Sequence, residues 1–197
     1  QILPSKTFLD ENFTSNILEE EVISNKYNIV HLATHSEFTP RNPKESKLYF
    51  SKGFITLKDI DSLRLSRDNN PLELFVLSSC RSALGDDENQ LGIAGLALQT
   101  GAHSAMGTLW YIDDLYTSAF FIRFYHILNK GFPKAEALRK TRIEFLNKKF
   151  LVENNNLIDI DGNILLRNLS NYQISTIQNE SDHPFYWAGP VMLGKPW

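Results

Sequence analysis

Three short apolar runs, each about the length of a buried β-strand, alternate along this chain with segments of helical periodicity. The runs cover residues 28–33, 72–79 and 103–110, and the first two are rich in Ile, Val, Leu and Phe. Such runs are typical of strands that a parallel sheet buries on both faces. Helices are expected at 15–25, 56–65, 92–102, 115–129 and 134–149. The alternation predicts an α/β fold in which a mainly parallel sheet is flanked by helices.

Residues 151–180 interrupt this alternation. They contain the pair Asp161-Gly162 between Ile and Leu residues, which is a hairpin signal. We therefore expect a hairpin-containing insertion at about 151–180. After it, residues 187–193 have the composition of a last strand. The segment 36–47, rich in turn-forming residues, is expected to be a polar loop.

Composition restricts the class of protein. A chain of 197 residues with 42% hydrophobic residues can bury a full core, so residues 1–197 are expected to form a single domain. The net charge of −3 argues against direct nucleic-acid binding. No apolar run reaches the roughly 20 residues needed to cross a bilayer, and no signal peptide begins the chain, so no membrane association is expected.

The cysteine content points to a reducing compartment. Cys80 is the only cysteine and cannot form an internal disulfide, which together with the missing signal peptide favours a cytoplasmic location. Because the chain opens with Gln1 rather than Met, we expect it to be the C-terminal part of a longer protein with an upstream module.

Two chemically active residues follow predicted strands. His35 comes just after the strand 28–33, and Cys80 follows the run 72–79. Catalytic groups in parallel sheets collect beyond the carboxyl ends of the strands, and neighbouring strands lie about 4.8 Å apart. The imidazole and the thiol are therefore expected to face each other. His31, inside the first strand, is better interpreted as a hydrogen-bonded core histidine.

This pair suits nucleophilic catalysis. A free thiol has a pKa of about 8.5, and a neighbouring histidine activates it by taking its proton. The backbone N–H groups of Ser36 and Cys80 are candidates to hold the oxyanion formed during acyl transfer. A lone cysteine at a strand end is more often a small buried hydrophobe, but the polar loop after Cys80 favours an accessible sulfur. No metal-ligand spacing is present, and no cofactor is expected.

Six motifs resemble one family in their order along nearly the whole chain. They are HLATHSEF, LSSCRSALG, GIAGLALQTGAHSAMGTLWYIDD, FYHILNKG, AEALRKTRIEFL and HPFYWAGPVMLG. In this order they resemble CHAT domains, a caspase-like and separase-like cysteine peptidase family often fused to tetratricopeptide repeats. The resemblance implies a caspase-hemoglobinase fold, a dyad of Cys80 and His35, and an upstream regulatory module such as tetratricopeptide repeats.

The chain departs from the family pattern at two positions. Ser36 replaces the Gly that usually follows the catalytic histidine, and a positive φ there would strain a serine by about 1 kcal/mol. Ser78 stands where metacaspases place the Asp that holds a basic P1 side chain. By likeness to separases, Asp114 or its neighbour Asp113 becomes the candidate for a P1 pocket that binds Arg or Lys. The alternative role for an Asp at this position is an ordinary helix N-cap.

The predicted function is a cysteine endopeptidase that cleaves a specific protein substrate after a basic residue. A degenerate, non-catalytic scaffold that binds protein partners is the alternative, and Ser36 is the feature that favours it. An acyl transferase or ligase using the same dyad is a third possibility, which only analysis of the products separates from hydrolysis.

Overall fold

The computed structural model describes residues 2–24, 26–39, 42–60, 71–78, 92–99 and 101–197. The chain packs as two compact units. The central-sheet unit consists of Ser5–Tyr111 and Pro190–Lys195. The helix-hairpin unit consists of Ile112–Gly189 with short segments from the two chain ends, Gln1–Pro4 and Pro196–Trp197.

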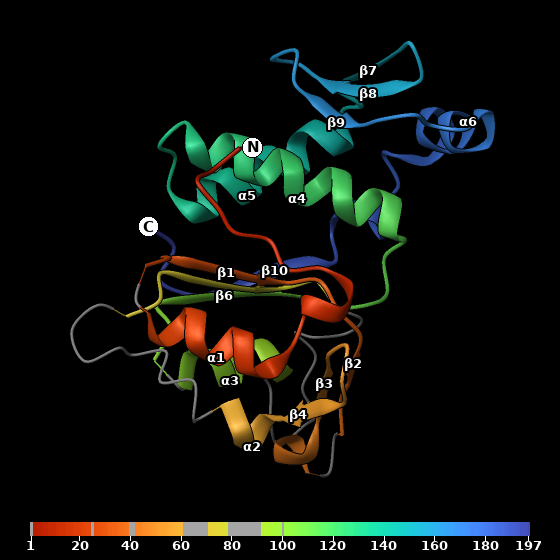
Figure 1. The fold of residues 1–197 in the computed structure, drawn as a ribbon. Coiled ribbons are helices and arrows are strands. Elements are labelled where there is room, and N and C mark those ends of the chain that lie inside the picture. Colours follow the sequence, from red (N-terminus) through yellow and green to blue (C-terminus); the bar gives the residue numbers. More distant parts are fainter. Residues whose placement is uncertain (1, 25, 40–41, 61–70, 79–91, 100) are drawn as a thin grey trace. The chain divides into compact units, whose positions relative to one another are not determined.

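The central sheet has the strand order β1-β5-β6-β10 (Figure 1). Its strands are β1 (Ile29–Leu32), β5 (Leu74–Leu77), β6 (Ser104–Thr108) and β10 (Pro190–Gly194). The β1–β5 and β5–β6 pairs are parallel, and β10 runs antiparallel to β6. The predicted mainly parallel α/β sheet is therefore confirmed, with its last strand as an antiparallel edge.

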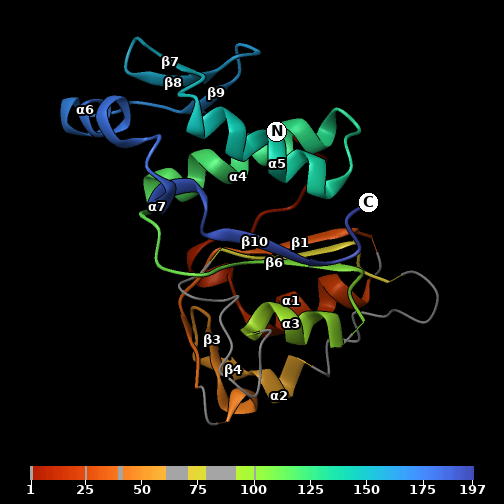
Figure 2. The ribbon, with the colours of Figure 1, turned by 180° about the vertical axis from the view of Figure 1, so that it is seen from behind.

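The core of this unit lies between the sheet and two helices. Every residue of β5 and β6 is buried. Helices α1 (Ser15–Ile23) and α3 (Gly92–Gln99) lie on the same face of the sheet (Figures 1 and 2). The side chains buried between them belong to one cluster, which includes Leu18, Val22, Leu32, Phe75, Leu77, Ala94, Ala97 and Ala105. Burying one side chain of the size of Phe75 contributes about 1.5–3 kcal/mol.

The segment expected to be a polar loop instead contributes to a second sheet. This sheet has the order β2-β3-β4, all antiparallel, and consists of β2 (Ser36–Glu37), β3 (Lys47–Tyr49) and β4 (Phe54–Thr56). The loop expected at 36–47 is therefore shorter than predicted, because its two ends belong to β2 and β3, and strands of two or three residues are too short to display an alternating pattern. Leu48, at the centre of β3, is fully buried and anchors the small sheet.

The remaining elements of this unit are short. They are the 3₁₀ turns η1 (Asp10–Asn12) and η2 (Pro43–Glu45) and the helix α2 (Leu57–Ile60). The Asp59 carboxylate accepts the Thr56 backbone N–H at 2.9 Å, which is one of the two bonds of a capping box. The rest of the predicted helix, residues 61–65, lies outside the described residues.

The helix-hairpin unit is built on two long helices. These are α4 (Asp114–Asn129) and α5 (Lys134–Leu146), close to the predicted 115–129 and 134–149. The predicted insertion follows as β7 (Phe150–Glu153), β8 (Asn156–Asp159), β9 (Ile164–Leu166) and α6 (Asn171–Glu180). A single helical turn, α7 (Pro184–Trp187), occupies the start of the expected strand 187–193, so that strand begins later, at Pro190.

Two hairpins form the insertion, one more than the sequence predicted. The expected hairpin joins β8 to β9 through Asp161 and Gly162, where Gly162 has φ of 84°. The second joins β7 to β8 through Asn154 and Asn155, with φ of 49° and 59°. Positive φ at both central residues is the signature of a type I′ turn, which matches the twist of the flanking strands.

A buried arginine joins the insertion to the helices. Arg123 of α4 is 2% exposed, and its guanidinium makes a two-pronged ion pair with Glu144 of α5. The same guanidinium donates to Asp159 and Asp161, each at 2.7 Å. The Asp159 carboxylate also accepts the backbone N–H groups of Asp161 and Asn163, both at 2.9 Å. Buried charges need this degree of pairing to be tolerated, so Arg123 fixes where the hairpin sits on α4 and α5.

None of the helices in the described part of the chain combines the length and apolar character required to cross a bilayer.

Candidate active site

His35 lies directly beyond the carboxyl end of β1 and is held by its backbone. The Tyr49 N–H donates to the His35 carbonyl at 3.1 Å, and the Thr34 hydroxyl donates to the Tyr49 carbonyl at 2.6 Å. These two bonds attach the end of β1 to β3. The His35 side chain is exposed, so the imidazole is accessible while its backbone is fixed.

Ser36 is the first residue of β2 and pairs with Leu48 of β3. The φ of Ser36 is not positive, so the strain expected of a serine in place of glycine does not arise. The bond from Tyr49 to His35 flanks the Ser36–Leu48 pair, which makes that pair a non-hydrogen-bonded one in the antiparallel ladder. The Ser36 N–H consequently points away from β3.

The end of β5 lies beside the end of β1. Leu32 pairs with Leu77, and the Ser78 N–H continues the ladder by donating to the Leu32 carbonyl at 3.0 Å. Ser78 is thus a direct neighbour of the β1 terminus, and Cys80 follows it by two positions in the sequence.

His31 makes the hydrogen bond that the sequence predicted, but it is not a core residue. Its Nε2 lies 2.8 Å from the Ser78 hydroxyl, which links the two neighbouring strand ends. The side chain is exposed. Burial of its ring nonetheless lowers the pKa of His31 to about 4, so the imidazole is neutral at pH 7.

Cys80, and with it the predicted nucleophile and the second oxyanion amide, lies outside the described residues. Its approach to His35 therefore stays a prediction. The described residues that bear on this prediction are His35 at the end of β1 and Ser78 at the end of β5.

A small polar cluster occupies the small sheet beside His35. The Tyr49 hydroxyl donates to the Glu37 carboxylate at 2.8 Å, and Lys47 approaches the same carboxylate at 3.4 Å. The Tyr49 hydrogen bond, and after it that of Lys47, lowers the pKa of Glu37, while the Glu37 bond raises the pKa of Tyr49. The carboxylate closest in sequence to His35 is therefore ionised and already engaged.

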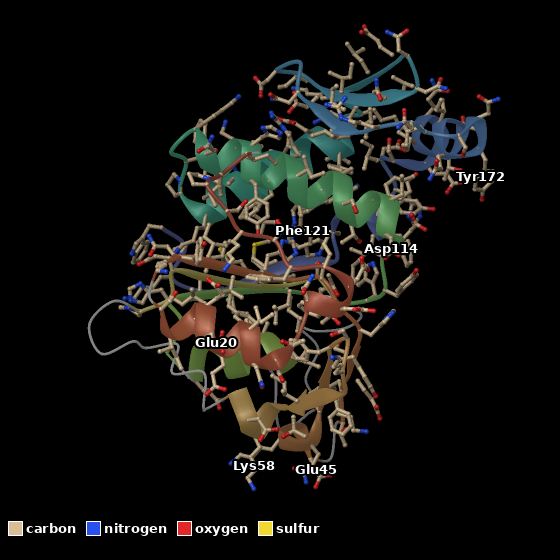
Figure 3. The ribbon with its side chains drawn as sticks, viewed as in Figure 1. Glu20, Glu45, Lys58, Asp114, Phe121 and Tyr172 are labelled. Atoms are coloured by element: carbon tan, nitrogen blue, oxygen red, sulfur yellow. The ribbon has the colours of Figure 1, made fainter. Side chains whose placement is uncertain are left out.

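The two acidic candidates for the P1 pocket lie at the start of α4 in the helix-hairpin unit, and they differ in role. Asp113 is the N-cap, and its carboxylate accepts the Leu115 N–H at 2.9 Å. Asp114 is the first residue of the helix and is exposed (Figure 3). The alternative role as an N-cap therefore applies to Asp113.

Sequence reasoning missed two interactions around His35. The Thr34–Tyr49 bond and the Tyr49–His35 bond depend on β3, whose three residues gave no periodic signal. The His31–Ser78 pair spans 47 positions of sequence. Pairing β1 with β5 in the correct register would have predicted the His31–Ser78 contact, because both residues lie near the carboxyl ends of paired strands.

No group of three or more His, Cys, Asp or Glu side chains among the residues that the structure describes is arranged to hold a metal ion.

The comparisons with known proteins agree with this architecture. A search of curated proteins gave no match. The family model of the CHAT domain matches residues 1–195, which is nearly the whole chain and includes both predicted dyad positions. CHAT domains are related to caspase-like cysteine peptidases, and the mixed α/β fold with its mainly parallel sheet is consistent with that relationship. This chain therefore belongs to the CHAT domain family.

Proposed function

We propose that this chain is a cysteine endopeptidase domain in which Cys80 is the nucleophile and His35 is the general base and acid. The observation that carries the proposal is the exposed His35 at the end of β1, next to the end of β5 where Ser78 precedes Cys80 by two positions. Adjacent strands about 4.8 Å apart bring side chains at such strand ends within reach of each other.

The reaction follows from the two groups. His35 takes the Cys80 proton, and the thiolate attacks the carbonyl carbon of the scissile peptide bond, forming a C–S bond. The imidazolium then gives that proton to the leaving amine as the C–N bond breaks. Water, deprotonated by His35, attacks the thioester, the C–S bond breaks, the acid product leaves, and the Cys80 thiolate recovers the proton from His35.

The Ser36 amide is proposed to stabilise the oxyanion together with the Cys80 amide. Two observations support this role: the Ser36 N–H points away from β3, and the φ of Ser36 is not positive. Donors fixed before the reaction are effective because they need no reorganisation as charge develops. The feature that favoured a non-catalytic scaffold, a strained Ser36, is thereby weakened.

For substrate preference we propose a basic P1 residue bound by Asp114. Asp113 is used as the N-cap, whereas the exposed Asp114 carboxylate is suited to a charge-assisted hydrogen bond with Arg or Lys. A protein substrate follows from the endopeptidase assignment, and an upstream module, such as the repeats often fused to CHAT domains, would control its access.

Covalent labelling tests the dyad. An acyloxymethyl ketone probe with Arg at P1 should label the wild-type chain and should fail with Cys80→Ala. His35→Gln should slow labelling by about a hundredfold or more, the low end for a general base. Labelling of Cys80→Ala equal to wild type would end the proposal. A folded wild-type chain that no probe labels, with slow alkylation of Cys80, would favour the scaffold.

The P1 assignment has a matched pair of variants. Asp114→Asn removes the proposed charge, while Asp113→Asn keeps a good N-cap residue. Only Asp114→Asn should abolish the preference for an Arg probe over a Leu probe. An unchanged preference in Asp114→Asn assigns the pocket to another residue.

A further inference from the structure

A groove of about 550 Å³ opens on the surface of the helix-hairpin unit where α6 gives way to α7. Its walls come from one continuous segment, and the lining residues are Asn179, Glu180, Asp182, His183, Pro184, Phe185 and Tyr186. The lining combines two carboxylates with two aromatic rings and contains no Lys or Arg.

The charge of the groove is negative. Glu180 and Asp182 contribute carboxylates, and the carboxyl end of α6 adds the partial negative charge of the helix dipole. His183 does not offset them, because its Nδ1 accepts the Phe185 N–H at 3.2 Å, which a doubly protonated imidazole cannot do.

A lysine of the same unit already demonstrates that this helix end attracts cations. The Lys148 ammonium donates to the carbonyls of Gln178 and Asn179, at 3.2 and 3.4 Å, and pairs with Asp182 at 2.9 Å. It thereby engages one of the two carboxylates. Glu180 accepts a hydrogen bond from the hydroxyl of Tyr186, and a neutral hydroxyl does not compensate the carboxylate charge.

The aromatic side chains complete the surface for a cation with an apolar stem. Phe185 is 43% exposed, and its ring meets that of Tyr186 edge to face at a centroid distance of 5.4 Å. Lys and Arg side chains lie favourably over such rings while their charged ends reach carboxylates. The hydrogen bond to Glu180, with partial burial and the charges of Glu180 and Asp113, raises the pKa of Tyr186 to about 12, in agreement with a negative field here.

The groove is joined to the start of α4. Tyr186 stacks on Tyr116 of the first turn of α4, with ring centroids 3.9 Å apart. Asp114, labelled in Figure 3, lies two positions before Tyr116 in the same turn. A peptide that placed one basic residue at Asp114 would pass next to this groove.

We infer that the groove between α6 and α7 binds a Lys- or Arg-containing segment of an extended polypeptide, through Glu180, Asp182 and the ring of Phe185. Its use as a second contact for a peptidase substrate rests on the proposed function. Binding itself does not, because no atom of the dyad takes part.

The test measures binding without catalysis. The full chain carrying Cys80→Ala is titrated against a fluorescein-labelled decapeptide containing four arginines, and against the same peptide with glutamine in place of arginine. The arginine peptide should bind at least tenfold more tightly, and its affinity should fall between 50 and 500 mM NaCl, since exposed charges are screened over a few ångströms at high salt. Equal affinity for the two peptides would overturn the inference.

Variants locate the site. Glu180→Gln combined with Asp182→Asn should weaken binding of the arginine peptide about tenfold, and Phe185→Ala about threefold. Glu153→Gln, which removes an exposed charge on β7 of the same unit, should leave it unchanged. If Glu153→Gln weakens binding as much as the double variant, only diffuse charge attracts the peptide and the inference fails.

Folding and catalysis are kept apart from this result. Glu180→Gln and Phe185→Ala, tested singly, replace the double variant if it does not fold, and unaltered affinity in both contradicts the site. If the probe does not label Cys80 of the wild-type chain while the arginine peptide still binds, the peptidase assignment is refuted and the groove inference is retained.

Discussion

Arg123 and His35 are both polar residues at the centre of hydrogen-bond networks, but the two units hold them in opposite ways. Arg123 is 2% exposed, and its side chain bonds to Glu144, Asp159 and Asp161. His35 is exposed, and its backbone carbonyl accepts the Tyr49 N–H. The Arg123 side chain makes the hydrogen bonds that hold its unit together. At His35 the backbone makes the hydrogen bond instead, and the side chain is accessible for chemistry.

Exposed side chains on a fixed backbone are the places in this molecule where chemical function is expected. A buried side chain whose donors all meet carboxylates contributes to the fold, and its removal leaves charges unpaired. An exposed side chain on a fixed backbone contributes little to stability. Measurements of stability and of reactivity should therefore separate the two networks.

The largest effect should come from Arg123→Met. Methionine fills much of the same volume but leaves Glu144 and Asp159 without their cation, and breaking a buried pair in this way costs about 3–5 kcal/mol. Urea unfolding at pH 7 measures the loss. The control is Arg139→Ala, since Arg139 pairs with Glu136 at 2.7 Å but is 58% exposed, and exposed pairs contribute at most about 1 kcal/mol. Equal losses in the two variants would show that burial does not distinguish these networks.

Sequence reasoning reached much of the fold and little of either network. The runs at 72–79 and 103–110 identified β5 and β6, whose residues are all buried. Asp161-Gly162 identified the β8–β9 hairpin because few residues tolerate that turn. Arg123 was not singled out, since its partners are 21 and 36 positions away and a helix pattern does not reveal which face meets a hairpin.

For the candidate site, the sequence identified the positions of the functional residues but not the residues that hold them in place. His35 follows β1 as predicted, and Asp113 is the helix N-cap, which was the alternative role given to this position. Thr34 and Tyr49 were not singled out, because a strand as short as β3 has no periodicity to detect. Whether Cys80 meets His35 stays a prediction for labelling to test.

The next effect is a pH dependence in the buried network. The hydrogen bonds from Lys130 and Arg123 hold the pKa of Asp161 below its usual value. A lowered folded-state pKa means that Asp161 stabilises the fold above its unfolded pKa of about 3.9, and that this stability is lost as the pH falls through the lower folded value. The difference in unfolding free energy between wild type and Asp161→Asn should thus be constant from pH 7 to about 5 and shrink below pH 4. A difference that stays constant to pH 2 would contradict the assignment.

A smaller effect is expected at the support of His35. Thr34→Val removes the hydroxyl that donates to the Tyr49 carbonyl at 2.6 Å, and the loss of one such bond costs about 0.5–1.5 kcal/mol. Thr34→Ser keeps the hydroxyl and is the matched control. Because this bond attaches the end of β1 to β3, Thr34→Val should also slow labelling of Cys80 by the Arg probe several-fold under conditions where the protein is fully folded. Full labelling speed in Thr34→Val would mean that the β3 attachment does not position His35.

The smallest effect should come from Tyr49→Phe, and it tests which part of Tyr49 matters. The hydroxyl of Tyr49 bonds to Glu37 at 2.8 Å on the surface of the small sheet, while its backbone N–H and carbonyl contact His35 and Thr34. Phenylalanine keeps the ring and the backbone, so stability should change by less than about 0.5 kcal/mol, as for other surface substitutions. Probe labelling should be unchanged, because no backbone bond to the β1 terminus is lost. A loss of labelling in Tyr49→Phe as large as in Thr34→Val would instead assign the positioning of His35 to the Glu37 cluster, and the contrast between a structural backbone and a free side chain would no longer hold at this site.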